Sequence, residues 1–449
     1  MKMALNKEMP LDFWYNRIVK KYHTKQKSEA PHMTNSTTDT YEIKRKIISF
    51  CNKLTKDAGQ VQTKFVQDMV YGLVKSKSVL LSNISDALIE PIKKINTIER
   101  LSNNLMNDLS PTIKANYNNQ VNKALGESPV ILVDDSDVIK PHGLHFESLG
   151  MVRDGSSIKK DYEKGYMVTE MVAVTQDKKQ PISLFSHIHS STDMQYRSTN
   201  TVTYQGLDEV IATLGRKATF VFDRGYDMNE LFKYMYMKDQ DFVIRLTERR
   251  KLFYKGRWHK STTLRDSRKG KIKTTVLFQG QEKECYISHL NVQITAAKKN
   301  MRLLLVYGLG NQPMMLATNK QILSKADAKD ILRFYLSRWR IEEYFRFKKQ
   351  EYDFENFRVR DLKAINNLNQ LLTYALGFIG LLADKVNGNR LSNKMIRNSN
   401  SIRGKVLFYC YQIAKGISMT LAYAKTGIEE WKNIRRTERN RQLEFNFIC

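Results

Sequence analysis

The chain has 449 residues and a formal net charge of +28, and 41% of its residues are hydrophobic. That apolar content is enough for a folded protein with more than one domain. So large a positive charge favours a polyanionic partner, either nucleic acid or an anionic membrane surface. The longest largely apolar stretch, residues 371–383, is shorter than the roughly 20 residues of a transmembrane helix. We therefore expect a nucleic acid partner and no membrane.

Four cysteines lie far apart in the sequence, and no two of them have the spacing of a zinc site: Cys51, Cys285, Cys410 and Cys449. The first residues reach a charge before a secretory apolar segment can build. We expect no structural zinc and a reducing, cytoplasmic compartment.

Residues 1–125 have helical periodicity and no evident strand. Apolar residues recur at helical spacing, for example at Phe65, Met69 and Leu73. A small helical domain in a strongly basic protein is typical of a DNA-binding module, so we interpret residues 1–125 as a helical N-terminal DNA-binding region. The alternative is an ordinary helical domain with solvated lysines.

The pattern changes after residue 129. Val130–Val133 is a short, wholly apolar run, as in a strand that is buried on both faces. Further strand candidates, separated in part by helical segments, follow at residues 167–175, 182–187, 219–222 and 242–244. This order of strands and helices predicts that residues 126–248 form the first part of an α/β domain with a mixed sheet.

Acidic residues follow two of these apolar runs. Asp135 comes soon after Val133, and Asp223 comes directly after Phe222. Functional side chains often gather beyond strand ends, although aspartate there is also common turn chemistry. Two such strands and an acid in a later helix favour a metal site made of three carboxylates.

The last three segments differ in character. Residues 249–320 contain alternating stretches between Gly- and Lys-rich turns, which predicts a β-rich insertion. Residues 321–385 return to helix and complete the α/β core. Residues 386–449 form a basic helical C-terminal region whose apolar spacing suits either packing into the core or a dimer contact.

Between residues 335 and 349, an acidic residue, two cationic residues and a tyrosine are spaced so that they lie on one side of a predicted helix. Residues of a helix advance by about 100° each, so Tyr335, Arg338, Glu342 and Lys349 share a narrow stripe and Glu343 lies outside it. An acid among cations suits a site that binds a divalent metal and phosphates together. The alternative is a solvated helix with an Arg338–Glu342 ion pair.

The stripe's spacing, Tyr-x2-Arg-x3-Glu-x6-Lys, resembles the Tyr-Arg-Glu-Lys (YREK) signature of bacterial insertion-sequence transposases with an Asp-Asp-Glu (DDE) site. Asp223-Arg-Gly-Tyr226 resembles their second-aspartate motif. The resemblance extends over about residues 60–385. It implies an α/β, RNase H-like mixed-sheet catalytic core, interrupted by a β-rich insertion and flanked by helical regions. The implied function is cut-and-paste DNA transposition.

Carried over to this sequence, the catalytic and metal-binding triad is Asp135, Asp223 and Glu342. Neighbouring strand residues point to opposite faces, so Asp134 and Asp135 cannot both face the metals in a regular strand. We favour Asp135 because a small hydroxyl residue, Ser136, follows it, as in the family. Asp134 remains the alternative.

The resemblance implies two Mg²⁺ ions, with Mn²⁺ as a substitute, for phosphodiester cleavage and strand transfer. It also implies double-stranded DNA as the partner, a homodimer in the synaptic complex, and a bacterial, nucleoid-associated location. Five residues are the candidates for DNA contact: Tyr335, Arg338, Trp339, Lys349 and Arg224.

Two other functions fit the sequence. One is a catalytically inactive DNA-binding regulator, which the intact acids at all three positions argue against. The other is a stand-alone metal-dependent nuclease that cleaves DNA without joining it.

Overall fold

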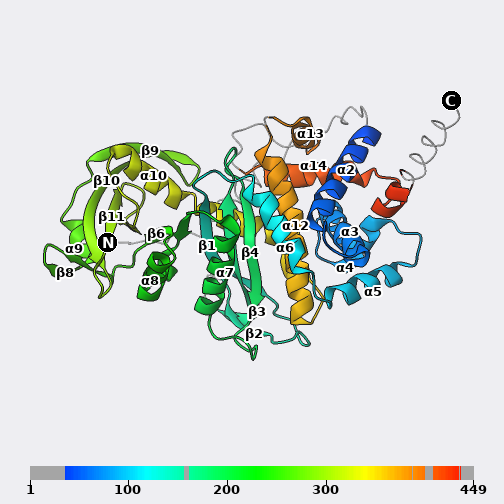
Figure 1. Ribbon diagram of the computed structural model, residues 1–449, viewed down its shortest axis with the longest axis horizontal. Coiled ribbons are helices and arrows are strands. Elements are labelled where there is room, and N and C mark those ends of the chain that lie inside the picture. Colours follow the sequence, from blue (N-terminus) through cyan, green and yellow to red (C-terminus); the bar gives the residue numbers. More distant parts are fainter. Residues whose placement is uncertain (1–35, 156–160, 387, 400–407, 434, 436–449) are drawn as a thin grey trace, which may run out of the picture.

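A computed structural model describes residues 36–155, 161–386, 388–399, 408–433 and 435. Within these residues the strands form one twelve-stranded sheet. In Figure 1 this sheet occupies the centre and left of the molecule, and a body of helices lies on the right. The first 35 residues of the predicted N-terminal region and residues 436–449 of the C-terminal region lie outside the described residues.

The central part of the sheet has the strand order β4-β3-β1-β5-β6, and β2 pairs with the beginning of β3. β1 is antiparallel to β3 but parallel to β5, and β5 is parallel to β6. This mixed α/β sheet agrees with the predicted RNase H-like core. The six strands are β1 (Val130–Ile139), β2 (Gly150–Arg153), β3 (Tyr162–Val174), β4 (Pro181–His189), β5 (Thr219–Phe222) and β6 (Asp241–Arg245).

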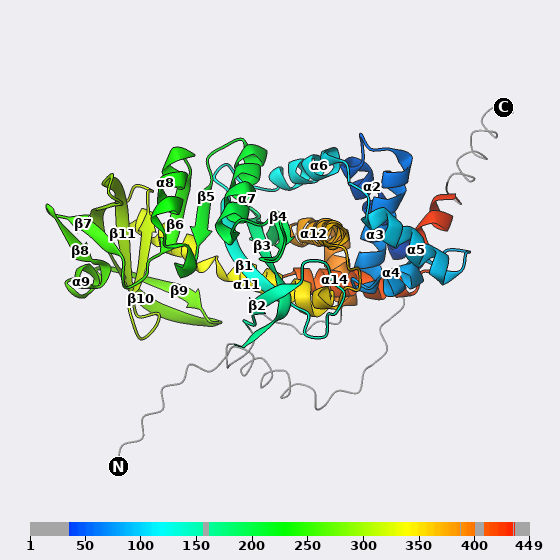
Figure 2. The same ribbon diagram turned by 90° about the horizontal axis from the view of Figure 1, so that it is seen from below.

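Helices cover both faces of this central sheet, which explains why its strands are apolar on both sides. Figure 2 shows α7 (Thr199–Leu214) and α8 (Asn229–Met237) along one face and α11 (Trp339–Arg346) on the other. α10 (Lys325–Leu336) precedes α11, and α12 (Leu362–Asp384) packs against β4. Both faces of β1 and β5 are therefore shielded from water.

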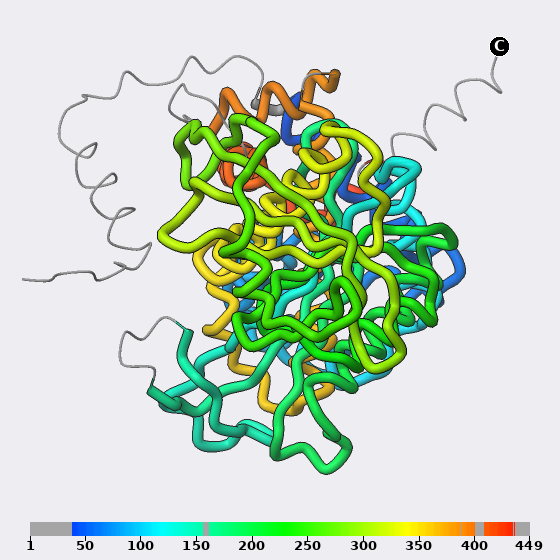
Figure 3. Tube along the Cα trace, turned by 90° about the vertical axis from the view of Figure 1, so that its left-hand side faces the viewer, coloured from blue at the N-terminus to red at the C-terminus, as the bar shows by residue number. Residues whose placement is uncertain are grey.

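The insertion continues the core sheet rather than forming a sheet of its own. Its last strand pairs with β6, with Ala317 opposite Ile244. Its longest strand, β10, pairs with β9 on one side and with β11 on the other. Figure 3 looks onto this end of the molecule, where the insertion lies in front. Its elements are β7 (Lys251–Tyr254), β8 (Arg257–Lys260), α9 (Ser261–Asp266), β9 (Ile272–Phe278), β10 (Gln281–Ile294), β11 (Lys299–Tyr307) and β12 (Met314–Thr318).

The described N-terminal and C-terminal helices form a single body. The Lys44 Nζ atom donates to the Thr426 carbonyl over 2.6 Å, and the Ser418 hydroxyl donates to the Lys75 carbonyl over 2.7 Å. The helices are α2 (Ser36–Leu54), α3 (Gln60–Ser76), α4 (Leu81–Leu88), α5 (Lys94–Leu105), α6 (Pro111–Asn122), α13 (Arg390–Asn398) and α14 (Cys410–Ala422).

Among the described residues, no helix combines the length and apolar character needed to cross a membrane.

Candidate active site

The acids that follow Val133 lie inside a strand and not at its end. We expected the strand to stop before Asp135, but β1 continues to Ile139 because β3 pairs with it along its whole length. The parallel partner β5 ends earlier, at Phe222, which lies opposite Val133. From Asp134 onward this edge of β1 therefore has no neighbouring strand, and Asp223 follows β5 at the same level.

Asp135 accepts hydrogen bonds from two hydroxyl groups. Thr169 Oγ1 donates to Asp135 Oδ1 over 2.5 Å, and the Tyr226 hydroxyl donates to Oδ2 over 2.7 Å. Burial raises the pKa of Asp135, the two hydrogen bonds lower it, and the charge of Asp223 raises it further. Both partners are uncharged hydroxyl groups, so neither of them neutralises the carboxylate.

Asp134 has a cationic partner instead. Arg338 Nη1 donates to Asp134 Oδ2 over 3.0 Å. Burial raises the pKa of Asp134 to about 7 even though the charge of Arg338 lowers it, and Asp223 and Asp135 add to the rise. The ion pair therefore offsets only part of the cost of burying Asp134 near two other carboxylates.

Arg338 also binds an acid of α11, since its Nη2 atom donates to Glu342 Oε1. Burial lowers the pKa of Arg338, but the charges of Glu342 and Asp134 more than compensate and hold it above its usual range. One guanidinium thus ties β1 to α11. The neighbouring acid Glu343 is buried and pairs with Arg346, so Glu342 alone faces this side.

Asp223 caps the short 3₁₀ turn Arg224–Tyr226, because its Oδ1 atom accepts from the Gly225 amide over 2.5 Å. Tyr226, at the end of that turn, reaches back to Asp135. The turn therefore links the end of β5 to the middle of β1.

The four residues of the expected stripe, Tyr335, Arg338, Glu342 and Lys349, do not lie on one regular helix. α10 ends at Leu336, α11 begins at Trp339, and a π-helical turn follows over Phe347–Glu351. The prediction that all four residues share one stripe is wrong, because it assumed an uninterrupted α-helix with about 100° between successive residues. Arg338 and Glu342, four residues apart, form the ion pair that the alternative interpretation named.

The remaining predicted DNA-contact residues have different surroundings. Tyr335 is buried in the core, whereas Trp339 is 42% exposed. Lys349 Nζ lies 3.4 Å from Asp137 Oδ1 and 3.2 Å from Glu355 Oε1. Arg224 is exposed at the end of β5.

Sequence reasoning missed the two hydroxyl residues that hold Asp135. Tyr226 belongs to the motif that contains Asp223, so the motif itself could have indicated it. Thr169 is one hydroxyl in an apolar strand, and only the strand register, in which it lies opposite Asp135, reveals its role. Thr169 also contacts His189 Nε2 over 3.0 Å.

The chemistry of the donors fits a hard divalent cation, which prefers carboxylate oxygens. The second oxygens of Asp223 and Glu342 accept no hydrogen bond from any described residue, and each oxygen of Asp135 has a further lone pair. Over the described part of the chain, however, no three His, Cys, Asp or Glu side chains converge as a metal site. Side chains would have to turn toward a bound ion.

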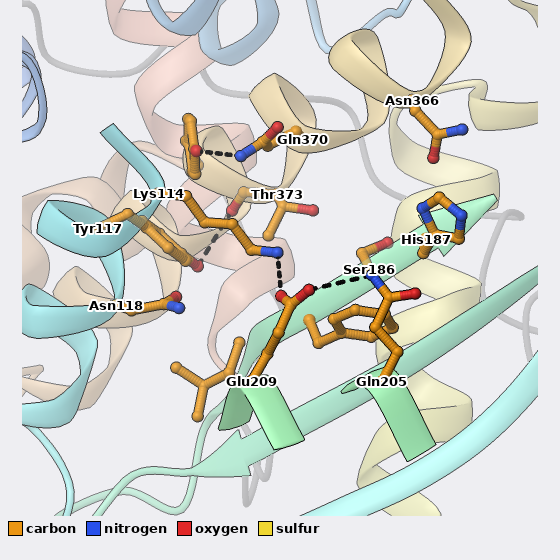
Figure 4. Close-up of a pocket in the computed structure, with 13 residues that line it drawn as sticks. Lys114, Tyr117, Asn118, Ser186, His187, Gln205, Glu209, Asn366, Gln370 and Thr373 are labelled. Atoms are coloured by element: carbon orange, nitrogen blue, oxygen red, sulfur yellow. Dashed lines mark hydrogen bonds and ion pairs between the residues drawn. The ribbon is translucent and has the colours of Figure 1, made fainter. Parts of the chain in front are cut away.

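A separate polar pocket lies at the edge of β4, between α6, α7 and α12 (Figure 4). It measures about 110 Å³. Lys114 and Glu209 form an ion pair in it, and the Tyr117 hydroxyl donates to the Thr373 carbonyl over 3.3 Å. None of the predicted site residues lines this pocket.

Comparison with known proteins agrees with the sequence resemblance. Residues 126–378 match the family described as transposase DDE domain. No curated protein matches the chain. Among solved structures, the chain is similar to a piggyBac transposase in a synaptic complex with hairpin DNA. The identity is 10%, the match covers 91% of this chain and 76% of that chain, and the TM-score is 0.40. Because the family match spans more than half of the chain, the protein belongs to the family of transposases with a DDE domain.

Proposed function

We propose that this transposase cleaves DNA at the ends of a transposon and transfers the cut strands into target DNA in a metal-dependent reaction. The observation that carries the proposal is the gathering of carboxylates where β1 passes the end of β5, inside the family region. Asp223 influences both Asp134 and Asp135 electrostatically, and Arg338 connects Asp134 to Glu342.

Asp135, Asp223 and Glu342 would hold the ions, since each has an oxygen with a lone pair to spare. Two Mg²⁺ ions, or Mn²⁺ in their place, would activate a water or a 3′-hydroxyl and stabilise the leaving oxygen. Thr169 and Tyr226 hold the Asp135 carboxylate by both oxygens, which restricts its rotation.

Asp134 is the second candidate for the first acid. It shares the Arg338 guanidinium with Glu342, which supports this alternative. We retain Asp135 because a small hydroxyl residue, Ser136, follows it, as in the family that the sequence resembles.

The DNA ligand follows from the charge of the chain and from cations around the acids. Arg338 and Lys349 would bind end-DNA phosphates in exchange for their present carboxylate partners. Exposed Arg224 and Trp339 would contact the flanking DNA, and buried Tyr335 would support Arg338 from within the core.

We further propose that the helical N-terminal region contacts DNA and that two copies pair the two transposon ends in a synaptic dimer. Two ends must be cut in concert, which a dimer makes possible. The protein would act in the bacterial cytoplasm, close to the nucleoid.

Incubation of the purified protein with labelled transposon-end DNA and Mg²⁺ or Mn²⁺ tests the proposal, with Glu342→Gln as the inactive control. Transposition requires both cleaved and joined products from the wild type. Cleavage without joined products would identify a nuclease. A wild type that binds the DNA but never cleaves it would identify a DNA-binding regulator.

A further inference from the structure

A fully buried ion pair lies directly behind the candidate active site. Lys348 Nζ is 3.1 Å from Glu170 Oε2, and the two side chains are 1% and 0% exposed. Such groups are almost never fully buried without a partner. Because charges lose their hydration on burial, a buried pair contributes little net stability. We therefore expect this ion pair to have a role other than stabilising the fold.

Polar side chains complete the surroundings of this pair. The Ser186 hydroxyl donates to Glu170 Oε2 over 2.8 Å, and it accepts from Lys348 Nζ over 3.1 Å and from Asn369 Nδ2 over 2.8 Å. Ser186 also lines the pocket of Figure 4. The pair and its neighbours therefore connect the π-helical turn after α11 with strands β3 and β4 and with helix α12.

Glu170 lies next to the candidate catalytic acids. In the register of β1 and β3 it is directly opposite Asp134. Side chains of directly opposite residues share one face of a sheet and lie close together. Without Lys348, Glu170 would add another negative charge on the face of the sheet that carries Asp134.

Lys348 belongs to the π-helical turn Phe347–Glu351, which continues α11. Lys348 points inward to Glu170, while its neighbour Lys349 reaches Asp137 and Glu355 at the edge of β1. A π-turn is uncommon and often occurs at functional sites. Here the buried contact of Lys348 anchors the turn on which Lys349 depends.

We propose that Lys348 and Glu170 are positioning residues that fix the π-turn and, through α11, set the position of Glu342 and Lys349 relative to the acids of β1. This inference rests on the proposed function for its catalytic consequence. Its structural consequence, a rigid α11 and π-turn, is independent of catalysis.

The test uses the double variant Lys348→Met/Glu170→Gln, which removes both charges and leaves no unpaired buried ion. The matched control is Asp384→Asn, which removes a buried carboxylate that accepts from Thr175, just beyond β3. Hydrogen–deuterium exchange is measured for both full-length variants, with thermal unfolding as the check on folding. We expect faster exchange over residues 339–351 in the double variant only. Unchanged exchange there in a folded double variant would overturn the proposal.

Single-turnover cleavage of labelled end DNA across a series of Mn²⁺ concentrations provides the second measurement. Small displacements of catalytic groups cost up to about a hundredfold in rate. We expect a loss of about that size and a higher half-saturating Mn²⁺ concentration in the double variant. A normal rate and metal requirement in the double variant would contradict the catalytic part. A wild type that fails to cleave would refute the proposed function, while the exchange measurement would still decide the positioning role.

Discussion

At the scale of single residues, the adjacent acids Asp134 and Asp135 differ in the groups that donate hydrogen bonds to them. Asp135 is held by the hydroxyls of Thr169 and Tyr226, whereas Asp134 is paired with Arg338. If Asp135 is the metal ligand, Asp135→Asn should lower single-turnover cleavage by about a thousandfold or more, because several kcal/mol of transition-state stabilisation depend on the metal. Asp134→Asn should keep the rate within about tenfold. The reverse order of the two variants would assign the first acid to Asp134.

Burial of His189 should make the stability of the folded protein depend on pH. Burial lowers its pKa from 6.5 to about 4, and the nearby His187 contributes. The folded protein therefore holds His189 neutral, while the unfolded chain takes up a proton below pH 6.5. The resulting stability is complete above that pH and is lost as the pH falls toward 4.

Between pH 7 and pH 5.5 the wild type should lose about 1 kcal/mol of unfolding free energy through this group. His189→Gln has no such proton to take up and should not show this loss, although it can still donate a hydrogen bond to Thr169. Urea unfolding of both proteins at the two pH values measures the difference. Equal losses would show that His189 titrates normally in the folded protein.

At the scale of elements, α10 illustrates how local sequence sets a boundary near the site. Ser324 and Asp327 form a capping box: the Asp327 amide donates to Ser324 Oγ, and the Ser324 amide donates to Asp327 Oδ2. These contacts satisfy donors that the first helical turn leaves unpaired. They fix the start of the helix that leads into α11.

Ser324→Ala should destabilise the protein by about 1 kcal/mol, the usual cost of losing an N-cap side chain. Ser324→Asp keeps a side-chain acceptor at the cap and serves as the matched control, with little change expected. Chemical unfolding measures both. A similar loss in the two variants would show that the effect comes from another feature of the serine.

At the scale of the whole molecule, the net charge of +28 predicts the response of DNA binding to salt. Each neutralised phosphate contributes a slope of about −0.9 to the dependence of log K on log salt, so about six contacts cost roughly a thousandfold in affinity between 50 and 200 mM salt. Fluorescence anisotropy with transposon-end DNA at several salt concentrations measures the slope. A slope near zero would exclude phosphate contacts as the main source of affinity.

The sequence by itself determined the features that depend on local pattern. Apolar runs located strands such as Val130–Val133 and Thr219–Phe222, and the four-residue spacing allowed the Arg338–Glu342 ion pair as an alternative interpretation. The resemblance in these motifs led to the family, which the comparison confirms. Local patterns suffice here because burial and helical spacing act over a few residues.

Only the tertiary structure decided the contacts between distant segments. The continuation of β1 past its acids depends on pairing with β3, and the union of the insertion with the core depends on β12 and β6. Lys348 and Glu170 are 178 residues apart and meet only because α11 packs on the sheet. Periodicity carries no information about which faces meet, so such pairs follow from topology and side-chain packing alone.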